Sequence, residues 1–266
     1  MAKIVWLASY PKSGNTWLRF LLTGVLAGRV ISSAQVARQV PDIHDGVAAH
    51  HLYGKGATVV KTHWKCWPEI PLREDTIGAI YVLRHPIEVL ESNLNYAFMR
   101  SGNLRNDASP EEVAAFAHRW VDGYIEHGGH KSFLDFGIGT WEENVRSWLG
   151  AKRFPQLIIR YERLRADTAG ELARICRFLE VERSADQLDT AIAAASRDAM
   201  RAIEEREIAS RVPGFFYQRR NQAGYEAGHR FVGRSRGGEA LFALTEEQRE
   251  RAMARFAPIM AELGYS

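Results

Sequence analysis

The first seventeen residues constrain the fold of this chain most. Ile4–Ser9 is a continuous apolar run of the kind that forms a buried strand. A short turn with one lysine, Lys12, follows it, and apolar residues at helical spacing begin at Thr16. In such a strand–turn–helix unit, the backbone N–H groups of the turn and of the helix N-terminus point at one spot. Because the helix dipole and Lys12 add positive charge there, the segment predicts a site for a phosphate or sulfate ester.

The order of residues in this turn differs from that of the common ATP- and GTP-binding loop. That loop requires G-x-x-x-x-G-K-[ST], whereas here the lysine precedes the glycine and no glycine opens the turn. An ordinary strand–turn–helix with a lysine on its surface is the alternative at this point. The candidate binding residues are those of the turn and the first helical turn: Lys12, Ser13, Gly14, Asn15, Thr16 and Trp17.

Length, composition and charge favour a globular protein built as one large domain over residues 1–266. The hydrophobic content is 46% and the charged content 25%, which suits a chain with a sizeable core. The net charge of +3 suits anionic ligands but is too small to indicate nucleic acid. No apolar stretch reaches membrane-spanning length, and the N-terminus has no signal-peptide pattern. With only two cysteines, Cys66 and Cys176, we expect a cytoplasmic protein.

Strand patterns alternate with helix patterns along the chain, which predicts an α/β fold with a central parallel sheet flanked by helices. The predicted strands are Ile4–Ser9, Ala57–Lys61, Ile77–Leu83 and Leu157–Arg160. The predicted helices are Thr16–Leu26, Pro86–Tyr96, Pro110–Tyr124, Thr168–Leu179 and Thr245–Leu263, the last opened by a Thr-x-x-Gln capping box. Two glycine- or arginine-rich segments, 97–140 and 206–239, interrupt the pattern, and we expect them to be mobile lids or acceptor-binding loops.

Polar and charged side chains follow three of the predicted strands. Lys61 and His63 follow the second, Arg84 the third and Tyr161 the fourth, while Ser92 lies eight residues beyond Arg84. The carboxyl ends of parallel strands are where an open α/β sheet binds ligands. A histidine can take a proton near neutral pH, and an arginine with a serine two helical turns on can hold one phosphate. Plainer interpretations are a structural histidine and an internal ion pair of the arginine.

These motifs together resemble the sulfotransferases that use 3′-phosphoadenosine 5′-phosphosulfate (PAPS). The resemblance rests on Tyr-Pro-Lys-Ser-Gly-x-Thr-Trp, Lys-Thr-His, Arg…Ser and Tyr-Glu, in that order and over nearly the whole chain. It implies a P-loop-kinase-like sulfotransferase fold and transfer of a sulfuryl group from PAPS to a hydroxyl. The product is then 3′-phosphoadenosine 5′-phosphate (PAP), and no metal ion is expected, since we find no suitable acidic cluster.

The resemblance also implies which residues bind the donor. The loop from Lys12 would hold the 5′-phosphosulfate, Trp17 and Tyr161 would lie near the adenine, and Arg84 with Ser92 would bind the 3′-phosphate. A basic loop near the C-terminus, with Arg234 and Arg236 as candidates, stands where the family has a second 3′-phosphate contact. Its match is loose, and a solvated basic loop is the alternative.

For catalysis, the resemblance makes His63 the general base that takes the acceptor proton during in-line attack on sulfur. We expect Lys12 to stabilise charge on the oxygen that bridges to the leaving phosphate, and Lys61 to assist at the transferring group. Two alternatives remain: a nucleotide-dependent kinase, which needs a Mg²⁺-binding acidic residue at a strand end, and a non-catalytic PAP-binding protein.

Within the family, Val145–Trp148, Met200-Arg201 with Glu204, and Phe231–Gly233 are similar to bacterial enzymes that sulfate glycopeptide antibiotics. Carried over, this would place Glu204 near the acceptor; a solvated Arg/Glu helix is the alternative. The expected partner is a small-molecule hydroxyl acceptor, peptide-like or aromatic, with no nucleic acid or membrane. Acceptor specificity should lie in 42–55, 97–140 and 206–239. The sequence indicates no oligomeric state.

Overall fold

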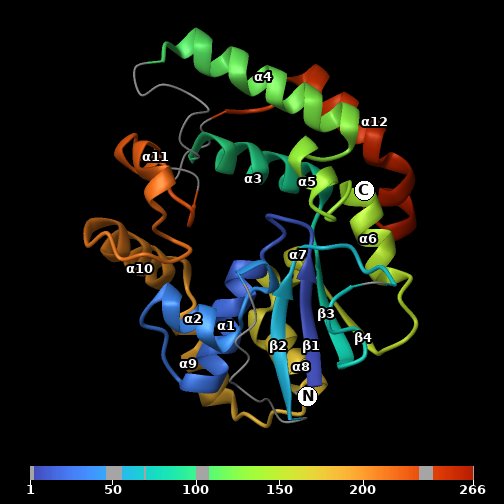
Figure 1. The fold of residues 1–266 in the computed structure, drawn as a ribbon, viewed down its shortest axis with the longest axis vertical. Helices are drawn as coiled ribbons and strands as arrows, with labels where there is room; N and C mark the ends of the chain where they lie inside the picture. The colour runs from blue at the N-terminus through green and yellow to red at the C-terminus, as the bar shows by residue number, and fades with distance from the viewer. Residues whose placement is uncertain (1–2, 46–55, 69, 100–107, 234–241, 266) are drawn as a thin grey trace. The chain divides into compact units, whose positions relative to one another are not determined.

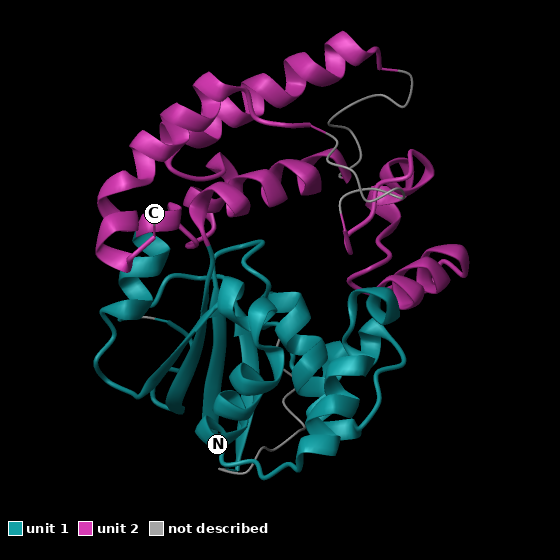
Figure 2. Ribbon diagram, turned by 180° about the vertical axis from the view of Figure 1, so that it is seen from behind, with its two compact units in different colours: residues 1–84, 143–200 teal, residues 85–142, 201–266 magenta. Residues whose placement is uncertain are grey.

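The computed structural model describes residues 3–45, 56–68, 70–99, 108–233 and 242–265. The chain divides into two compact units, which Figure 2 colours separately. The first comprises Met1–Arg84 and Glu143–Met200, and the second His85–Glu142 and Arg201–Ser266. The single domain expected over 1–266 stays a prediction.

The first unit is built around a four-stranded, wholly parallel sheet in the order β2-β1-β3-β4 (Figure 1). Since β1 has a neighbour on each side, its residues from Ile4 onward are buried. Ala8 pairs with Thr62 on one side and Tyr81 on the other, so the carboxyl ends of three strands lie at one sheet edge. The strands confirm the four predicted runs: β1 (Lys3–Ser9), β2 (Ala57–Thr62), β3 (Thr76–Leu83) and β4 (Gln156–Arg160).

Helices α1 and α9 of the first unit pack closely, and Figure 1 shows them grouped with α2. Gly24 permits this approach, because a Cβ there would lie 2.9 Å from the Ala191 Cα. The helical elements of this unit are α1 (Asn15–Ala27), α2 (Ser33–Gln39), η1 (Ile43–Asp45), α7 (Tyr161–Ala166), α8 (Thr168–Phe178) and α9 (Ala185–Ala194). Two further helices run across the unit boundary: α6 (Trp141–Leu149) and α10 (Arg197–Ala209).

The described part of the second unit is helical. Its α12 begins at the predicted capping box, in which Thr245 Oγ1 accepts the Gln248 N–H at 3.1 Å. Helix α12 packs against α3 and α4, and Trp141 meets the ring of Phe256 edge-on with centroids 5.7 Å apart. The elements are α3 (Pro86–Met99), α4 (Pro110–His127), α5 (Lys131–Asp135), η2 (Arg219–Asn221), α11 (Gln222–Glu226) and α12 (Glu246–Leu263).

The expected α/β class, with a central parallel sheet flanked by helices, is confirmed. Over the described ranges, no helix is both long enough and apolar enough to cross a membrane. The roles of 97–140 and 206–239 as lids or acceptor loops stay predictions; the first contains α4 and α5, and the second contains η2 and α11.

Candidate active site

The turn between β1 and α1 has the conformation of an anion-binding loop. Lys12 and Gly14 both have positive φ angles, of 70° and 103°, which reverse the chain after β1. Gly14 caps α1 without a side-chain hydrogen bond, and the first turn of α1 holds no acidic residue. The N–H groups at this helix N-terminus therefore have no side-chain cap at Gly14 and no carboxylate from the first turn of their own helix, as suits an anion.

The loop is locked to the strand behind it by Asn15. Its Nδ2 donates to the Leu7 carbonyl at 3.1 Å and to Ser9 Oγ at 3.2 Å, and the side chain is buried. Ser13 is also buried, and its N–H donates to the Tyr10 carbonyl at 3.3 Å. The side chain of Asn15 thus fixes the conformation of the loop. The loop is left to present its backbone to a ligand.

Five predicted donor-binding residues come together around the ring of Tyr161, the first residue of α7. A Cβ on Gly14 would lie 2.5 Å from Tyr161 Cδ2, so only glycine fits between the loop and this ring. The Arg84 guanidinium lies over the ring, 4.2 Å from its centroid, and donates through Nη1 to the Lys12 carbonyl at 2.9 Å. Trp17 meets the ring edge-on at 6.0 Å. Thr16, half-buried in the first turn of α1, adjoins this group in the chain.

His63, directly after β2, is joined to the end of β1. Its Nδ1 lies 2.8 Å from the Ser9 carbonyl oxygen. Because a carbonyl can only accept, Nδ1 must carry the proton, which leaves the lone pair of the neutral ring on Nε2. Burial, together with the charge of Lys61, holds the pKa of His63 well below its ordinary value. The ring is therefore neutral at pH 7, as a general base must be.

Lys61 is paired inside the structure. Its Nζ donates to Asp42 Oδ2 at 2.7 Å, and only 9% of its side chain is exposed. Burial lowers the pKa of Lys61, against the opposing charge of Asp42. Burial also opposes ionisation of Asp42, but the charge and hydrogen bond of Lys61 outweigh it and keep the pKa of that carboxyl below its ordinary value.

A set of side chains that sequence reasoning missed fixes the backbone around His63. Asn144 Nδ2 donates to the His63 carbonyl at 2.9 Å, and its Oδ1 accepts from the Tyr81 hydroxyl at 2.9 Å. Trp148 Nε1 donates to the Trp64 carbonyl at 2.8 Å. Asn144 and Trp148 lie on α6, an amphipathic helix with buried tryptophans, and nothing in its sequence pattern signals these partners. Asp42, His44 and Ser9 carry no sequence signal either.

The remaining predicted residues belong to the second unit or lie outside the described residues. Ser92 lies on α3 in the second unit, so its partnership with Arg84 stays a prediction. Arg234 and Arg236 fall outside the described residues. His63, Lys12, Lys61, Arg84, Tyr161 and the loop all belong to the first unit.

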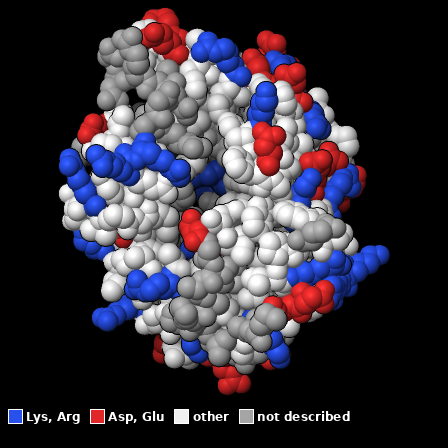
Figure 3. Space-filling view, in the orientation of Figure 1, with Lys and Arg blue, Asp and Glu red and all other residues white. Residues whose placement is uncertain are grey.

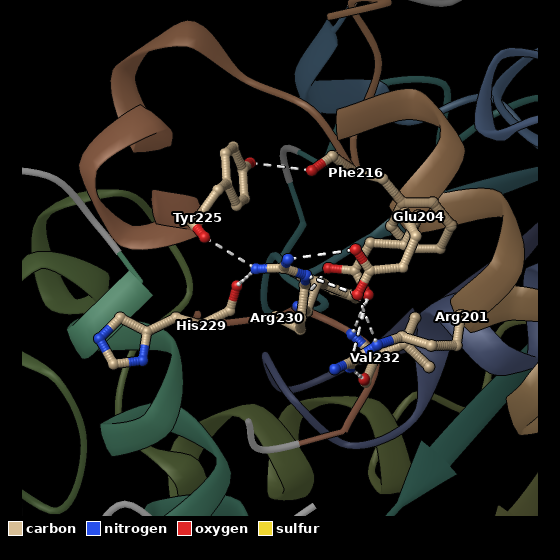
Figure 4. Close-up of polar contacts among 9 residues, drawn as sticks. Arg201, Glu204, Phe216, Tyr225, His229, Arg230 and Val232 are labelled. Atoms are coloured by element: carbon tan, nitrogen blue, oxygen red, sulfur yellow. Dashed lines mark hydrogen bonds and ion pairs between the residues drawn. The ribbon is translucent and has the colours of Figure 1, made fainter. Parts of the chain in front are cut away.

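Glu204 on α10 is fully buried, and Figure 4 shows its carboxylate directed at the backbone of residues 231–232. Its oxygens accept the N–H groups of Phe231 at 2.5 Å and Val232 at 2.9 Å. The next residue, Glu205, accepts two hydrogen bonds from the Arg230 guanidinium, at 2.8 and 3.1 Å. Burial raises the pKa of Glu204 to about 7, although the two N–H groups oppose the shift. The Glu204 side chain thus fixes the backbone at residues 231–232.

Both signs of charge occur on the face of the molecule that Figure 3 draws. Figure 3 shows Lys and Arg side chains interspersed with Asp and Glu side chains over the face that it draws, in keeping with the net charge of +3. In the part of the chain that the structure describes, no group of three or more His, Cys, Asp or Glu side chains could hold a metal ion.

A helix N-terminus without a side-chain cap, a lysine in the loop and a neutral histidine lie at the same end of the parallel sheet, an arrangement that suits the binding of an anion. The family model described as "Sulfotransferase domain" matches residues 3–264. The chain belongs to this family, which confirms the expected enzyme class.

Known relatives agree with this assignment. Rat Sulfotransferase 2A6 is 24% identical over 273 residues, which cover 96% of this chain and 86% of that protein. Mouse Sulfotransferase 2A1 is 25% identical over 207 residues, covering 73% of this chain and 65% of its own length, slightly under two thirds.

Solved structures share the fold. Mouse sulfotransferase SULT7A1, complexed with PAP, has a TM-score of 0.60 at 20% identity, covering 98% of this chain and 84% of that one. Retinol dehydratase, in complex with androsterone and the inactive cofactor PAP, has a TM-score of 0.56 at 16% identity, with coverage of 97% and 80%.

Proposed function

We propose that this chain transfers a sulfuryl group from PAPS to a hydroxyl of a small molecule. The observation that carries the proposal is the hydrogen bond from His63 Nδ1 to the Ser9 carbonyl at 2.8 Å. It places a neutral imidazole at the end of β1, where the anion-binding loop begins. PAP in the solved structures of two sulfotransferase-like proteins supports PAPS as the donor.

The residues around the loop suit this donor. The N-terminus of α1, with Lys12, would hold the 5′-phosphosulfate. Tyr161 and Trp17 offer aromatic surface for the adenine, and Arg84 is a fixed cation beside them. Ser92, Arg234 and Arg236 complete the proposed 3′-phosphate contacts. PAPS would supply the activated sulfuryl group, and these residues would position it and balance its charge.

His63 acts as the general base. The lone pair on Nε2 takes the proton of the acceptor hydroxyl as its oxygen attacks sulfur. The ring then carries protons on both nitrogens, and the Ser9 carbonyl still accepts the hydrogen bond from Nδ1. Lys12 stabilises the charge that grows on the oxygen bridging to the leaving phosphate. Lys61 contributes its charge from the Asp42 pair, close enough to affect the pKa of His63.

For the acceptor, we propose a natural product with peptide-like or aromatic character, as in the bacterial glycopeptide-sulfating enzymes that the sequence resembles. The resemblance at Arg201 and Glu204 supports this, and the half-buried aromatic side chain of Phe215 would suit such an acceptor, whereas Phe216 and Tyr217 are buried. Since the Glu204 carboxylate accepts two backbone N–H groups, its contribution is to hold residues 231–232.

Calorimetric titration with PAP, ATP and adenosine 5′-phosphate, each with and without Mg²⁺, tests the donor. We expect Mg²⁺-independent preference for PAP, because the site offers cations and backbone N–H groups for phosphates. Preference for ATP with Mg²⁺ would refute the proposal in favour of a kinase. Tight PAP binding with no transfer from PAPS to a panel of phenols, sugars and hydroxylated peptides would favour a PAP-binding protein.

A further inference from the structure

The segment before residue 46 runs along the end of β2. The Lys61 N–H donates to the Pro41 carbonyl at 2.8 Å, and Asp42 pairs with Lys61 in a parallel bridge. The short helix η1 follows at once, and the Asp45 N–H donates to the Asp42 carbonyl at 3.0 Å. This backbone path carries the side chain of His44 to the residues that follow β2.

The side chain of His44 contacts the backbone of His63, the proposed base. The His44 Nε2 accepts the backbone N–H of His63 at 3.2 Å. The two imidazole rings are stacked with centroids 6.2 Å apart and planes at 28°, and His44 meets the ring of Trp64 edge-on at 4.7 Å. Since β2 ends at Thr62, the N–H of His63 lies just past the strand, and a side chain supplies its acceptor.

His44 is in turn held by the carboxylate that pairs with Lys61. Asp42 Oδ1 accepts the His44 N–H at 3.1 Å, while its Oδ2 accepts from Lys61 Nζ at 2.7 Å. A continuous path of hydrogen bonds therefore links Lys61, Asp42, His44 and His63. It meets the second path, from Tyr81 through Asn144, at the opposite side of the same residue: one holds the N–H of His63 and the other its carbonyl.

We propose that His44 is a positioning residue for sulfuryl transfer, holding the backbone of His63 so that its Nδ1 stays on the Ser9 carbonyl and its Nε2 faces the acceptor. The inference rests on the proposed function, because it assigns a task to the same base. It requires His44 to accept at Nε2, so the ring must be neutral with its proton on Nδ1.

The charges around His44 agree with that proton state. Burial and then the Lys61 ammonium lower the pKa of His44, while Asp42 and Asp45 act in the opposite direction. Among the residues that the structure describes, His63 also faces it, and the lowered pKa of His63 keeps that ring neutral. A proton on His44 Nε2 would make that atom a donor facing the N–H donor of His63, and the hydrogen bond would break. Acid should therefore lower activity in two ways: it protonates His63 itself, and it removes the hydrogen bond by which His44 holds the backbone of His63.

Two substitutions distinguish the role of the hydrogen bond from the role of ring packing. His44→Leu removes the acceptor and keeps apolar bulk, whereas the amide oxygen of His44→Gln can replace Nε2. The first measurement needs no turnover: ¹⁵N NMR of the His63 imidazole, with amide hydrogen exchange of the His63 N–H, in the full chain. We expect faster exchange and loss of the Nδ1–H tautomer with leucine, and wild-type behaviour with glutamine. Unchanged exchange and tautomer with leucine would overturn the proposal whether or not the chain transfers sulfate.

Kinetics with PAPS then test the consequence. His44→Leu should lower kcat about tenfold, the effect expected from losing one orienting hydrogen bond, with the Kd for PAP unchanged. His44→Gln should restore kcat to within about threefold, and its acid limb should become less steep because one titrating group is gone. Equal loss in both variants, or an unchanged acid limb with glutamine, would show that the ring only packs. If the wild-type chain transfers no sulfuryl group, the proposed function fails while the NMR result still decides the role of His44.

Discussion

Two neighbours of His63 determine the tautomer and the charge of its ring. The Ser9 carbonyl decides which ring nitrogen carries the proton, and burial with Lys61 decides that the ring is neutral. We predict that His63→Ala lowers kcat about 10²–10⁴-fold, the usual contribution of a general base. PAP should bind as before, since the ring is not among the donor contacts. Steady-state kinetics with PAPS, and calorimetry with PAP, measure the two effects.

The control for this substitution is His127→Ala on α4, a histidine whose Nδ1 bonds the Gly123 carbonyl of its own helix. It should leave kcat unchanged. Because the pKa of His63 is lowered, wild-type activity should also persist below pH 6.5 and be lost only as pH falls further. Near-wild-type turnover in His63→Ala would remove this residue as the base.

Arg84 contacts the Tyr161 ring and the Lys12 carbonyl in the first unit, and we predict a further contact with the 3′-phosphate. Arg84→Ala should therefore weaken binding of PAP at least tenfold, and binding of adenosine 5′-phosphate much less. Arg165→Ala is the matched control, because that guanidinium also lies near the Tyr161 ring but farther from its centroid, at 6.0 Å instead of 4.2 Å. Equal loss for the two nucleotides would refute the 3′-phosphate assignment.

At this scale the sequence predicts residues that a motif or a strand end marks, such as Lys12, His63 and Arg84. It does not reveal the residues that hold them. Asp42, His44 and Asn144 meet the site only through β-pairing and helix packing between segments 19 to 81 residues apart in the chain. Their own surroundings in the sequence are those of ordinary loops and helices, so no local signal distinguishes them.

Among the elements, the shape of the loop between β1 and α1 depends on Gly14, which has no side chain. We predict that Gly14→Ala lowers stability by about 1–3 kcal/mol and weakens PAP binding more than tenfold. Alanine is strained at φ 103°, and its Cβ would force Tyr161 away from the loop. Urea unfolding and calorimetry give the two numbers.

The other end of α1 supplies the control. Gly28 has φ 68°, but a Cβ there would meet no atom within 4 Å. Gly28→Ala should thus cost about 1 kcal/mol of backbone strain and leave PAP binding intact. Similar PAP affinities for the two variants would mean that the contact between loop and Tyr161 does not shape the site.

Helix α10 carries two adjacent carboxylates with opposite pKa shifts. The pKa of Glu204 rises from about 4.5 in the unfolded chain to about 7, so the folded chain binds this proton more tightly. Its contribution to stability is therefore present below pH 4.5 and is lost as pH rises through 7. At about 1.4 kcal/mol per pKa unit, the loss is about 3 kcal/mol. Unfolding of the wild type and Glu204→Gln from pH 5 to 8 should show that this decline disappears in the variant.

Glu205→Gln is the neighbouring control. Arg230 holds the pKa of Glu205 below its ordinary value, so this group contributes stability above that value and loses it as pH falls. It is also partly exposed, so its effect should be small. The decline in the free energy of unfolding between pH 5 and 7 should remain in Glu205→Gln. If it disappears in both variants, Glu204 and Glu205 share the proton.

The elements themselves were largely predictable, because each strand is a short apolar run and several helices begin at a proline or a capping box. The structure confirms all four strands within about one residue at either end, as well as the box at Thr245. The helix α9 was not predicted. Its alanine-rich stretch has weak periodicity, and its packing depends on the long-range contact of Ala191 with Gly24.

For the whole molecule, the order of the motifs predicted the family, whereas the division of the chain into two compact units was not foreseen. That division depends on which helices pack together: α3, α4 and α12 associate although α12 is more than a hundred residues away in the chain. Periodicity marks an apolar face on each helix but does not name its partner.

Ligand linkage gives a prediction for the molecule as a whole. A ligand that binds only the folded chain stabilises it by about 2.7 kcal/mol at a hundred times its Kd. For a protein of this size, that should raise Tm by about 5–10 °C. We predict this shift with PAP in the absence of Mg²⁺, and a much smaller one with adenosine 5′-phosphate at the same concentration, because the predicted 3′-phosphate contacts then have no ligand group. His63→Ala should keep the PAP shift, since it removes only a proton acceptor. Gly14→Ala distorts the anion-binding loop, and with a Kd more than tenfold higher it should lose about half of the shift or more. An undiminished PAP shift in Gly14→Ala would place the nucleotide elsewhere on the molecule. A shift that requires Mg²⁺ would contradict a donor site made of Lys12, Arg84 and backbone N–H groups.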